Sequence, residues 1–460
     1  MARLSAREAE RPTPDGVRVV LDARPMQEPE RSPLTAEYLD RLLRAFAAQP
    51  IAGESFVIVS RTLRADPADE LATAGLPVAG RRRVPPTTRV LRSAGLTLDS
   101  FLLRAVELGT ADGAENGAVF HTAGGAVPLA SRLPVVATLL DMAPWDLPQT
   151  YASSAAARFG HRLRVRVLRD AARVIVCSRA TAESARRRLH LPADRLAVVP
   201  LAVDTDYRAA ASDAAFVASV RERLGLPERY LAFSGRYDAR KDMRTLFQAL
   251  ALLRDPGRST RRKNVAGGPP TLVVALEHAR PRDVELINAA MYRHGVGDLC
   301  KVIVPVDARQ RAAIVAGSEA FVYPSLSEAT ALPALEALSV GVPAIVSRAG
   351  ALPETVGSAG IVVEPRDPQR LAAALQAFWD RGSLAEQLRR RAQRRAESAA
   401  RTWSDVAYET RQVYAEAATG SRPASERRRV RNPVRRVTLV SPFGPARVFR
   451  RPAGGYPGRR

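Results

Sequence analysis

The stretch PSLSEATALPALEALSVGVPAIVS, residues 324–347, places two glutamates, Glu328 and Glu336, eight positions apart among apolar and small residues. Its pattern predicts a buried strand, a loop, a helix with Pro333 in its first turn, and Gly341 at the helix end. Glu328 is then expected in the loop above the carboxyl end of the strand, and Glu336 in the first turn of the helix. Because a buried charge is costly without a partner, the sequence raises the question of which group these carboxylates meet.

Apolar runs that favour strands alternate with amphipathic helical stretches along most of the chain, which is typical of βαβ units and parallel sheets. In the first half the expected strands lie at 17–23, 55–60, 118–122, 134–141 and 173–178, with a helix over 32–49. In the second half they lie at 229–236, 271–276, 300–306, 320–325, 343–347 and 360–365. The sequence therefore predicts an α/β protein with two doubly wound, Rossmann-like domains.

The same pattern sets the expected domain boundaries. We expect a disordered N-terminus over 1–16, a first domain over 17–205, a second over 206–385, a closing helix over 386–418, and a basic disordered tail over 419–460. Open parallel sheets bind ligands at the carboxyl ends of their strands, so two such domains predict a binding cleft between them.

The chain carries a net charge of +23, and much of it lies at the C-terminus. Residues 421–460 hold twelve arginines and one glutamate, a net of +11, with interspersed Pro and Gly. Such a tail predicts contact with an anionic membrane surface, and the alternative is a solvated tail without a partner. No zinc-finger spacing or basic-region heptad accompanies it, so sequence-specific nucleic-acid recognition is not expected.

The composition is that of a soluble globular protein: 46% of the residues are hydrophobic, 25% are charged, and no apolar run reaches the length of a membrane span. No signal peptide is visible at the N-terminus. The two cysteines, Cys177 and Cys300, indicate neither a disulfide framework nor a metal site. The expected location is the cytoplasm, and the basic tail predicts peripheral contact with the inner face of the plasma membrane.

The block around Glu328 and Glu336 resembles the donor-binding motif of bacterial family-four retaining glycosyltransferases of the GT-B fold (glycosyl transferases group 1), whose pattern is glutamate, seven residues, glutamate. The stretch SGRYDARKDMRTL, residues 234–246, resembles the family's Gly-Arg, short loop, Lys segment. Residues 347–365 and 402–417 also resemble the family. The resemblance covers roughly residues 17–418 and implies an acceptor domain followed by a nucleotide-sugar domain, facing a central cleft.

The resemblance also implies roles for particular residues. Glu328 would hold the sugar and is the expected catalytic residue, Glu336 would bind the ribose, and Arg236 and Lys241 would neutralise the diphosphate. No metal or other cofactor is then needed. Lys241 is one of only three lysines in a chain with sixty-seven arginines, so its place in this segment is not easily explained as that of an ordinary solvent-exposed residue. The donor-binding residues implied in this way are Gly235, Arg236, Lys241, Glu328, Thr330, Ala331, Leu332 and Glu336.

The chain departs from the family pattern at three places. The first loop, residues 22–39, lacks the family's glycines, and Leu140 stands where the family often has a histidine, although the following Asp141 is kept. Residues 329–331 read Ala-Thr-Ala where glycines are common; a left-handed backbone there would cost alanine up to ~1 kcal/mol. Asp141 and His121 are the acceptor-side candidates, and His121 also has a purely structural interpretation.

These features predict a glycosyltransferase that moves a hexose from a nucleotide diphosphate sugar to a glycan or lipid-linked acceptor with retention of configuration. Leu140 in place of histidine predicts slow or specialised transfer. The alternative is a catalytically degenerate relative that binds a nucleotide sugar or a partner protein.

Overall fold

The structure is a computed structural model of the 460-residue chain. It describes residues 16–84, 118–123, 133–254, 268–277, 279–398 and 400–420, which belong to one compact unit ending at Gly420. The segments predicted to be disordered, 1–16 and 419–460, lie outside the described residues except at their inner edges.

The first domain is built on a parallel sheet, whose described strands follow the spatial order β3, β2, β1, β4, β5, β6, β7. Their bounds are β1 (Arg18–Asp22), β2 (Ser55–Arg61), β3 (Val78–Val84), β4 (Ala118–Ala123), β5 (Val135–Leu139), β6 (Arg173–Val176) and β7 (Leu196–Val198). The sequence did not predict β3. This edge strand carries three consecutive arginines, Arg81 to Arg83, because an edge position leaves charged side chains in solvent.

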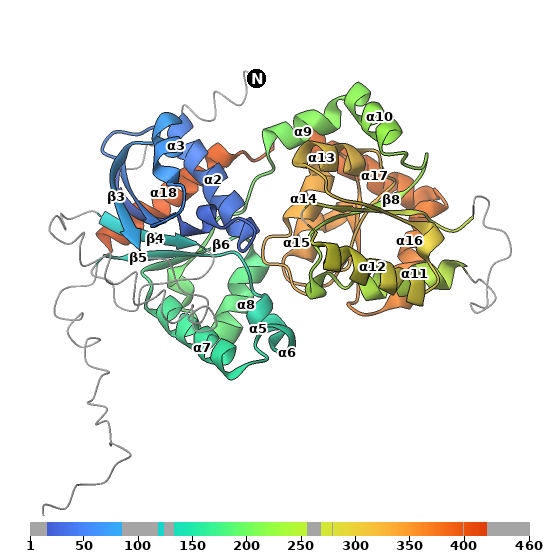
Figure 1. Cartoon of the computed structure of the whole chain (residues 1–460), viewed down its shortest axis with the longest axis horizontal. Coiled ribbons are helices and arrows are strands. Elements are labelled where there is room, and N and C mark those ends of the chain that lie inside the picture. Colours follow the sequence, from blue (N-terminus) through green and yellow to red (C-terminus); the bar gives the residue numbers. More distant parts are fainter. Residues whose placement is uncertain are drawn as a thin grey trace, which may run out of the picture. The chain divides into compact units, whose positions relative to one another are not determined.

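Helices cover both faces of this sheet (Figure 1). They are η1 (Arg24–Gln27), α2 (Pro33–Ala48), α3 (Pro67–Thr73), α5 (Ala143–Asp146), α6 (Pro148–Tyr151), α7 (Ala155–Asp170), α8 (Arg179–Leu189) and η3 (Ala193–Arg195). Successive residues of β1 point to opposite faces: Val19 and Leu21 enter the core with α2, whereas Val20 enters the core with α7 and α8. The three central residues of the strand, Val19 to Leu21, are therefore all apolar.

The second domain repeats the plan with the order β10, β9, β8, β11, β12, β13. The strands are β8 (Leu231–Gly235), β9 (Leu272–Leu276), β10 (Cys300–Ile303), β11 (Phe321–Tyr323), β12 (Ala344–Ser347) and β13 (Gly360–Val363). The helices are α9 (Thr205–Ser212), α10 (Ala214–Arg223), η4 (Ala239–Lys241), α11 (Met243–Arg254), α12 (Pro281–Arg293), η6 (Gly297–Leu299), α13 (Ala308–Ala316), α14 (Leu332–Ser339), α15 (Leu352–Val356), η7 (Gly357–Ala359), α16 (Pro368–Trp379) and α17 (Ser383–Glu397). Two parallel-sheet domains confirm the predicted fold class.

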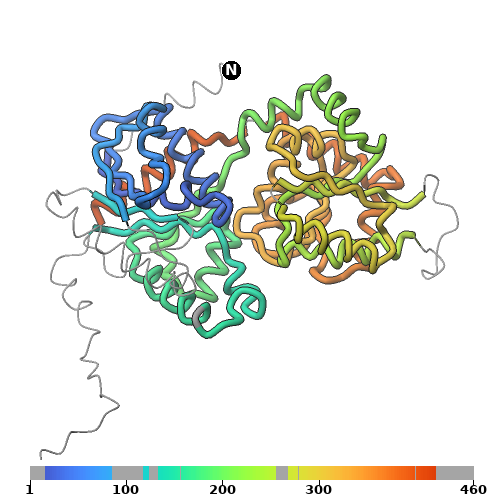
Figure 2. The backbone as a smooth tube through the Cα atoms, in the orientation of Figure 1, coloured from blue at the N-terminus to red at the C-terminus, as the bar shows by residue number. Residues whose placement is uncertain are grey.

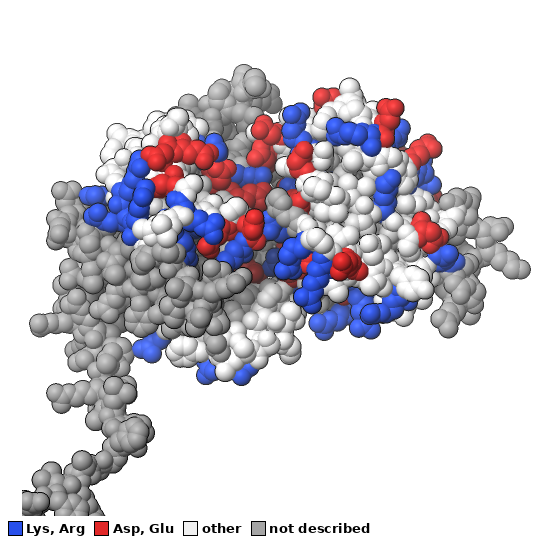
Figure 3. Space-filling view, viewed as in Figure 1, with Lys and Arg blue, Asp and Glu red and all other residues white. Residues whose placement is uncertain are grey.

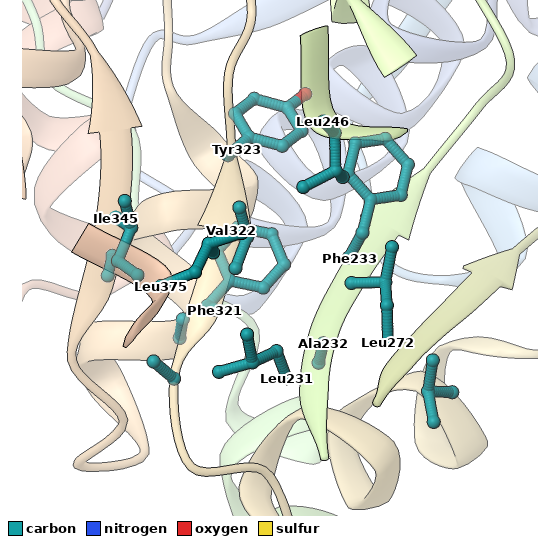
Figure 4. Close-up of a cluster of buried hydrophobic side chains, with 14 of the residues drawn as sticks. Leu231, Ala232, Phe233, Leu246, Leu272, Phe321, Val322, Tyr323, Ile345 and Leu375 are labelled. Carbon is teal, nitrogen blue, oxygen red and sulfur yellow. The ribbon is translucent and has the colours of Figure 1, made fainter. Parts of the chain in front are cut away.

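The centre of the second sheet is the contact between β8 and β11. Phe233, Phe321 and Tyr323 form a stacked group there, with ring centroids 5.8 and 5.6 Å apart, and Figure 4 shows them among Leu231, Val322 and Ile345. Aromatic rings in offset contact add to the stabilisation from burial alone. This group sets the two central strands side by side, which matters for the site described below.

The predicted closing helix is two helices. α17 packs against α14 and η7 of the second domain, whereas α18 (Trp403–Thr419) packs against α2 and the strands β4 to β6 of the first. Figure 2 shows the last described segment returning among first-domain elements. α17 ends because the chain becomes extended at Ser398. α18 begins after Thr402, whose hydroxyl caps the new helix by accepting a hydrogen bond from Asp405 N at 3.3 Å.

An ion pair buried beneath α18 holds this helix to the first domain. Arg411 donates to both carboxylate oxygens of Glu54 at 2.9 and 2.7 Å, and also to the carbonyl of Gln49 at 2.7 Å. The two side chains are only 5% and 1% exposed. The guanidinium thus meets a carboxylate and the carbonyl of Gln49, the residue that follows α2.

We expect Arg411→Ala to lower the free energy of unfolding by ~3–5 kcal/mol, because it leaves the Glu54 carboxylate buried without a cation. A matched control is Arg173→Ala, which removes a partly exposed pair with Glu416 on the same helix and is expected to cost less than ~1 kcal/mol. Urea denaturation of both variants measures the difference. Equal losses would contradict the assigned role of Arg411.

Candidate functional site at the carboxyl ends of the second sheet

The strand order of the second sheet reverses direction between β8 and β11, which are neighbours in the sheet but not in the sequence. Ligands of doubly wound folds bind outside the carboxyl ends of the strands at such a switch point. Here β8 is followed by residues 236–241 and β11 by residues 324–331. The two segments that carry the predicted donor-binding residues therefore meet at the position where this fold places its ligands.

Glu328 and Lys241 form a buried ion pair at this point. Lys241 Nζ lies 2.6 Å from Glu328 Oε1, and the two side chains are 7% and 6% exposed. The ammonium also donates to the Tyr323 hydroxyl and lies 4.5 Å from the centre of that ring, while Ser325 Oγ donates to Glu328 Oε1 at 2.8 Å. Tyr323 thus links the aromatic group at the sheet centre to the ion pair.

Burial by itself would raise the pKa of Glu328, but the charges of Lys241 and Arg240 outweigh it and hold that pKa below its usual value. Burial lowers the pKa of Lys241, and Glu328 opposes this. The carboxylate is therefore kept ionised and can accept hydrogen bonds. The ammonium is already bound within the protein, so a phosphate would have to share it.

Glu336 also has a partner in the chain. Its Oε2 and Oε1 accept hydrogen bonds from Arg311 Nη1 and Nη2 at 2.6 and 3.1 Å, and Arg311 Nε lies 2.7 Å from Glu277 Oε1. Glu336 is the fifth residue of α14, so it lies in the second turn rather than in the predicted first, and it is only 1% exposed. Burial raises the pKa of Glu336 to about 7, although Arg311 opposes the rise.

The sequence interpretation made the ligand the partner of both glutamates, and it missed Arg311. The available signal was local: Arg311 is followed by AAIVAG, an apolar run in which a buried arginine requires a carboxylate. The structure shows that α13 packs against α14 and pairs this arginine with Glu336. Each glutamate is thus neutralised by a cation of the chain before any ligand binds.

Arg236 differs from these paired residues. It follows Gly235 at the end of β8, is half-buried, and has no hydrogen bond or ion pair with any part of the chain that the structure describes. Burial lowers its pKa, and the more distant charges of Glu277 and Glu37 oppose this. Beside Gly235, whose φ is +138°, the space is open. A cation without a counter-ion next to open space is suited to an anionic ligand.

The loop between Glu328 and α14 is held from two sides. The carbonyl of Ala329 accepts from Thr181 Oγ1 at 2.8 Å and from Ser178 Oγ at 3.3 Å, both at the start of α8. The carbonyl of Glu328 accepts from Ala351 N at 2.8 Å. A side chain at Gly350 would lie 2.0 Å from that carbonyl, so glycine is required there.

Ala331 adopts the left-handed conformation, with φ of 50° and ψ of 29°, at the N-cap of α14. Alanine here therefore adopts a backbone that glycine reaches more easily, at a strain of ~1 kcal/mol. Thr330, Ala331 and Leu332 are all buried, with exposures of 9%, 0% and 6%. The predicted donor loop is thus a packed element of the domain.

The acceptor-side candidates lie in different surroundings. Asp141 is 40% exposed and pairs with Arg240 at 2.7 Å, whereas Leu140 is buried. His121 has no exposed surface: its Nε2 is 2.9 Å from Thr138 Oγ1 and its Nδ1 is 2.7 Å from the Tyr414 hydroxyl. In this structure His121 is a core residue beneath α18, beyond the reach of an acceptor, in agreement with its structural interpretation.

The loop after β1, which lacks the expected glycines, holds a buried ion pair. Arg24 donates to both oxygens of Asp22 at 2.7 and 2.8 Å. Within the described ranges no group of three or more His, Cys, Asp or Glu side chains is arranged to bind a metal ion. The helices described there include none that is long and apolar enough to span a membrane.

Comparison with known proteins places this geometry in a family. The profile of the family described as glycosyl transferases group 1 matches residues 217–395, and that of Glycosyltransferase Family 4 matches residues 35–207. A D-inositol 3-phosphate glycosyltransferase of Xylanimonas cellulosilytica is 31% identical over 307 residues, 65% of this chain and 68% of that protein. The chain belongs to the glycosyl transferases group 1 family.

Other relatives match a smaller part. The D-inositol 3-phosphate glycosyltransferase of Streptomyces scabiei is 32% identical over 256 residues, 54% of each chain, so the match spans about half of such relatives. Sucrose-phosphate synthase from Thermosynechococcus elongatus superposes with a TM-score of 0.62 at 20% identity, over 88% of this chain and all of that one. WaaG, a glycosyltransferase of lipopolysaccharide biosynthesis, superposes with a TM-score of 0.62 at 15% identity, with the same coverage. These structures confirm the GT-B fold.

The burial of His121 predicts a specific acid sensitivity. Burial lowers its pKa to about 3 in the folded protein, from 6.5 for a free histidine. Between these values the unfolded chain binds more protons than the folded one, so stability is present above pH ~6.5 and is lost as the pH falls towards ~3. We expect His121→Gln to reduce the pH slope of the free energy of unfolding below pH 6.5 by ~1 kcal/mol per pH unit.

Urea denaturation of both proteins at several pH values measures this slope. The packing cost of the substitution appears equally at every pH and does not alter the comparison. A variant with the slope of the wild type would contradict the neutral, buried state of His121.

Proposed function

We propose that this protein transfers a hexosyl group from a nucleotide diphosphate sugar to an acceptor, with retention of the anomeric configuration. The observation that carries the proposal is Arg236, a half-buried cation without a protein partner among the described residues, in the segment after β8 that also holds Lys241, the partner of the buried Glu328. Membership of the glycosyl transferases group 1 family supports glycosyl transfer. The GT-B protein HepE of Anabaena, which has the same fold, was solved with UDP and with UDP-glucose.

The arrangement of charges suggests how a donor would bind. Arg236 would meet the diphosphate first, because its charge is not neutralised by a nearby carboxylate. Lys241 would be the second cation, with its ammonium shared between the phosphate and Glu328. Glu328 would then accept hydrogen bonds from sugar hydroxyls, and Glu336 would accept them from the ribose if its contact with Arg311 opens. These positions retain the predicted assignments and add Arg311 as the residue that holds Glu336.

In the proposed reaction the bond between the anomeric carbon and the phosphate oxygen breaks, and the acceptor oxygen forms a bond to the same face of that carbon. The acceptor's proton passes to the departing phosphate oxygen, so no side chain has to act as the base. Arg236 and Lys241 would stabilise the negative charge that develops on the diphosphate. The protein's contribution is thus positioning and electrostatic stabilisation, with no metal or cofactor required.

A second candidate function is favoured by two observations. Leu140 is buried and apolar where the family often has histidine, and Glu336 is closed off by Arg311. Both fit a protein that binds a nucleotide sugar, or a partner, without turnover. The two functions differ in product formation alone, so a binding test and an activity test have to be made separately.

For donor binding, we expect Arg236→Gln to weaken nucleotide-sugar affinity by ~1.5–3 kcal/mol, the worth of a hydrogen bond to a charged group. Its melting temperature should remain unchanged, because the substitution leaves no buried carboxylate without a partner. Lys241→Ala and Glu336→Ala should weaken binding by a similar amount, but they also break buried ion pairs and require a stability control. Arg348→Gln, which removes an exposed pair with Glu364, is the matched control.

Isothermal titration against a panel of nucleotide diphosphate sugars, with hydrolysis monitored by mass spectrometry, makes this measurement. Equal affinities for Arg236→Gln and wild type would mean that the diphosphate site has been placed wrongly.

For catalysis, we expect slow product formation by the wild type and a fall to background for Glu328→Gln. The measurement uses the best-bound donor with lipid, glycan and polyol phosphate acceptors, inositol 3-phosphate among them because several relatives are named for it. Donor affinity is measured for Glu328→Gln at the same time, because a fall in product larger than the fall in bound donor separates loss of chemistry from loss of the site. If wild type and variant give the same background, the catalytic proposal is wrong and donor binding alone remains.

A further inference from the structure

The helix α7 presents a stripe of arginines on the first domain. Arg158, Arg162, Arg166 and Arg169 are all exposed and are spaced by four, four and three residues, which places them on one face over roughly 16 Å. Asp170 is the only acidic residue of the helix. Figure 1 shows α7 on the side of the first sheet opposite α2 and α3.

The four arginines of the stripe have no carboxylate partner within the described part of the chain. Several exposed helical arginines elsewhere in the described ranges have one three or four positions away, as in the pairs Arg44–Asp40, Arg186–Glu183, Arg370–Asp367 and Arg390–Glu386, whereas Arg391 and Arg394 of α17 have none. Figure 3 shows the same mixing of the two signs over most of the described surface on one face. Across the described ranges, none of the four arginines of the stripe lies within 4.0 Å of a carboxylate.

Their other contacts leave the charge unneutralised. Arg158 donates to the carbonyl of Ser153 at 2.9 Å, and Arg169 to that of Leu189 at 2.7 Å. A carbonyl orients a guanidinium without cancelling its charge. Like charges four residues apart on a helix repel each other and destabilise it by ~0.2–0.5 kcal/mol a pair. The stripe therefore opposes folding slightly and is suited to an external polyanion.

Apolar side chains accompany the charges. Phe159 is 56% exposed beside the stripe. A surface hollow of about 760 Å³ lies between α5, α6, α7 and α8. Its apolar walls include Trp145, Pro148 and Val165. Its lining also includes three arginines of the stripe, Arg158, Arg162 and Arg166. An apolar hollow with arginines around it combines the two features that a phospholipid requires, one for the acyl region and one for the phosphate.

We propose that the α7 stripe, with Phe159 and the adjacent hollow, is a docking surface for an anionic phospholipid membrane. Helices that lie at the boundary of head groups and acyl chains combine arginines with exposed aromatic side chains, as α7 does. Each basic residue near an anionic surface contributes about 1 kcal/mol. A soluble phosphate would meet one or two of these arginines, whereas a lipid surface meets the whole stripe.

The position of the stripe in the chain relates it to the acceptor side. α5 begins at Ala143, two residues after Asp141, and leads through α6 into α7. A lipid held there would be next to the elements that follow the candidate acceptor residue. Lipid-anchored proteins attach stably when two signals combine, and in this chain the arginine-rich segment 421–460, which lies outside the described residues, would supply the second one.

The experiment is flotation of the full chain with vesicles of phosphatidylcholine containing about one-third phosphatidylglycerol. The triple variant Arg158→Gln/Arg162→Gln/Arg166→Gln is expected to lower the partition coefficient ten-fold or more at low ionic strength, with less difference at high salt. Phe159→Ser is expected to lower it about five-fold at either salt concentration, because its contribution is apolar. All variants should bind vesicles of phosphatidylcholine alone weakly, and their melting temperatures should match the wild type.

The matched control is α12, which has an exposed aromatic residue, Tyr292, at 89% and exposed arginines, but also Asp283 and Glu285. Arg282→Gln/Arg293→Gln and Tyr292→Ser should leave flotation unchanged. A chain ending at Gly420 is expected to float less than the full chain and to retain its dependence on the α7 arginines.

Three outcomes would overturn the proposal. One is flotation of the α7 triple variant equal to that of the wild type, and another is an equal loss in the α12 control. The third is a loss of single-stranded nucleic-acid binding in the α7 variant with unchanged flotation, which would assign the stripe to nucleic acid. None of these outcomes depends on donor binding or transfer.

Discussion

Two carboxylates buried at the carboxyl end of the second sheet require cations, and much of the second domain is arranged to supply them. Lys241 comes from the segment after β8 and Arg311 from α13. Removing an ion from water costs several kcal/mol, which a close counter-ion with further hydrogen bonds must offset. Tyr323, Ser325 and Glu277 complete those contacts. The charges of both carboxylates are thus neutralised by cations of the chain before any ligand arrives. Arg236, in contrast, has no counter-ion among the described residues.

The order of the strands explains why these groups meet. β8 and β11 are adjacent in the sheet although almost ninety residues separate them in the chain, and the stacked Phe233, Phe321 and Tyr323 join them. The segments that leave their carboxyl ends must then face each other. Glu328 is fixed further by Gly350, where a side chain has no space, and by the contact of Ala351 N with its carbonyl. Backbone and side-chain constraints act on the same loop.

The two domains differ in how closely they follow the expected motif. The predicted donor segments hold the expected charged residues, and Ala331 adopts the left-handed backbone that glycine adopts more easily. On the acceptor side a buried Asp22–Arg24 pair occupies the first loop, Leu140 is buried, and Asp141 pairs with Arg240. The charged face of α7 belongs to this same domain.

The sequence by itself determined the two doubly wound domains, because strands buried on both faces are apolar throughout and their helices have one apolar face. It missed β3, where the edge position allows Arg81 to Arg83. It also predicted the donor segments, because Glu328, Glu336, Arg236 and Lys241 occur in recognisable local patterns. The partners of the two glutamates were decided only by the tertiary structure. Lys241 lies 87 residues from Glu328, and Arg311 lies 25 residues from Glu336. Ion pairing depends on distance in space and on burial, and neither can be read from spacing along the chain.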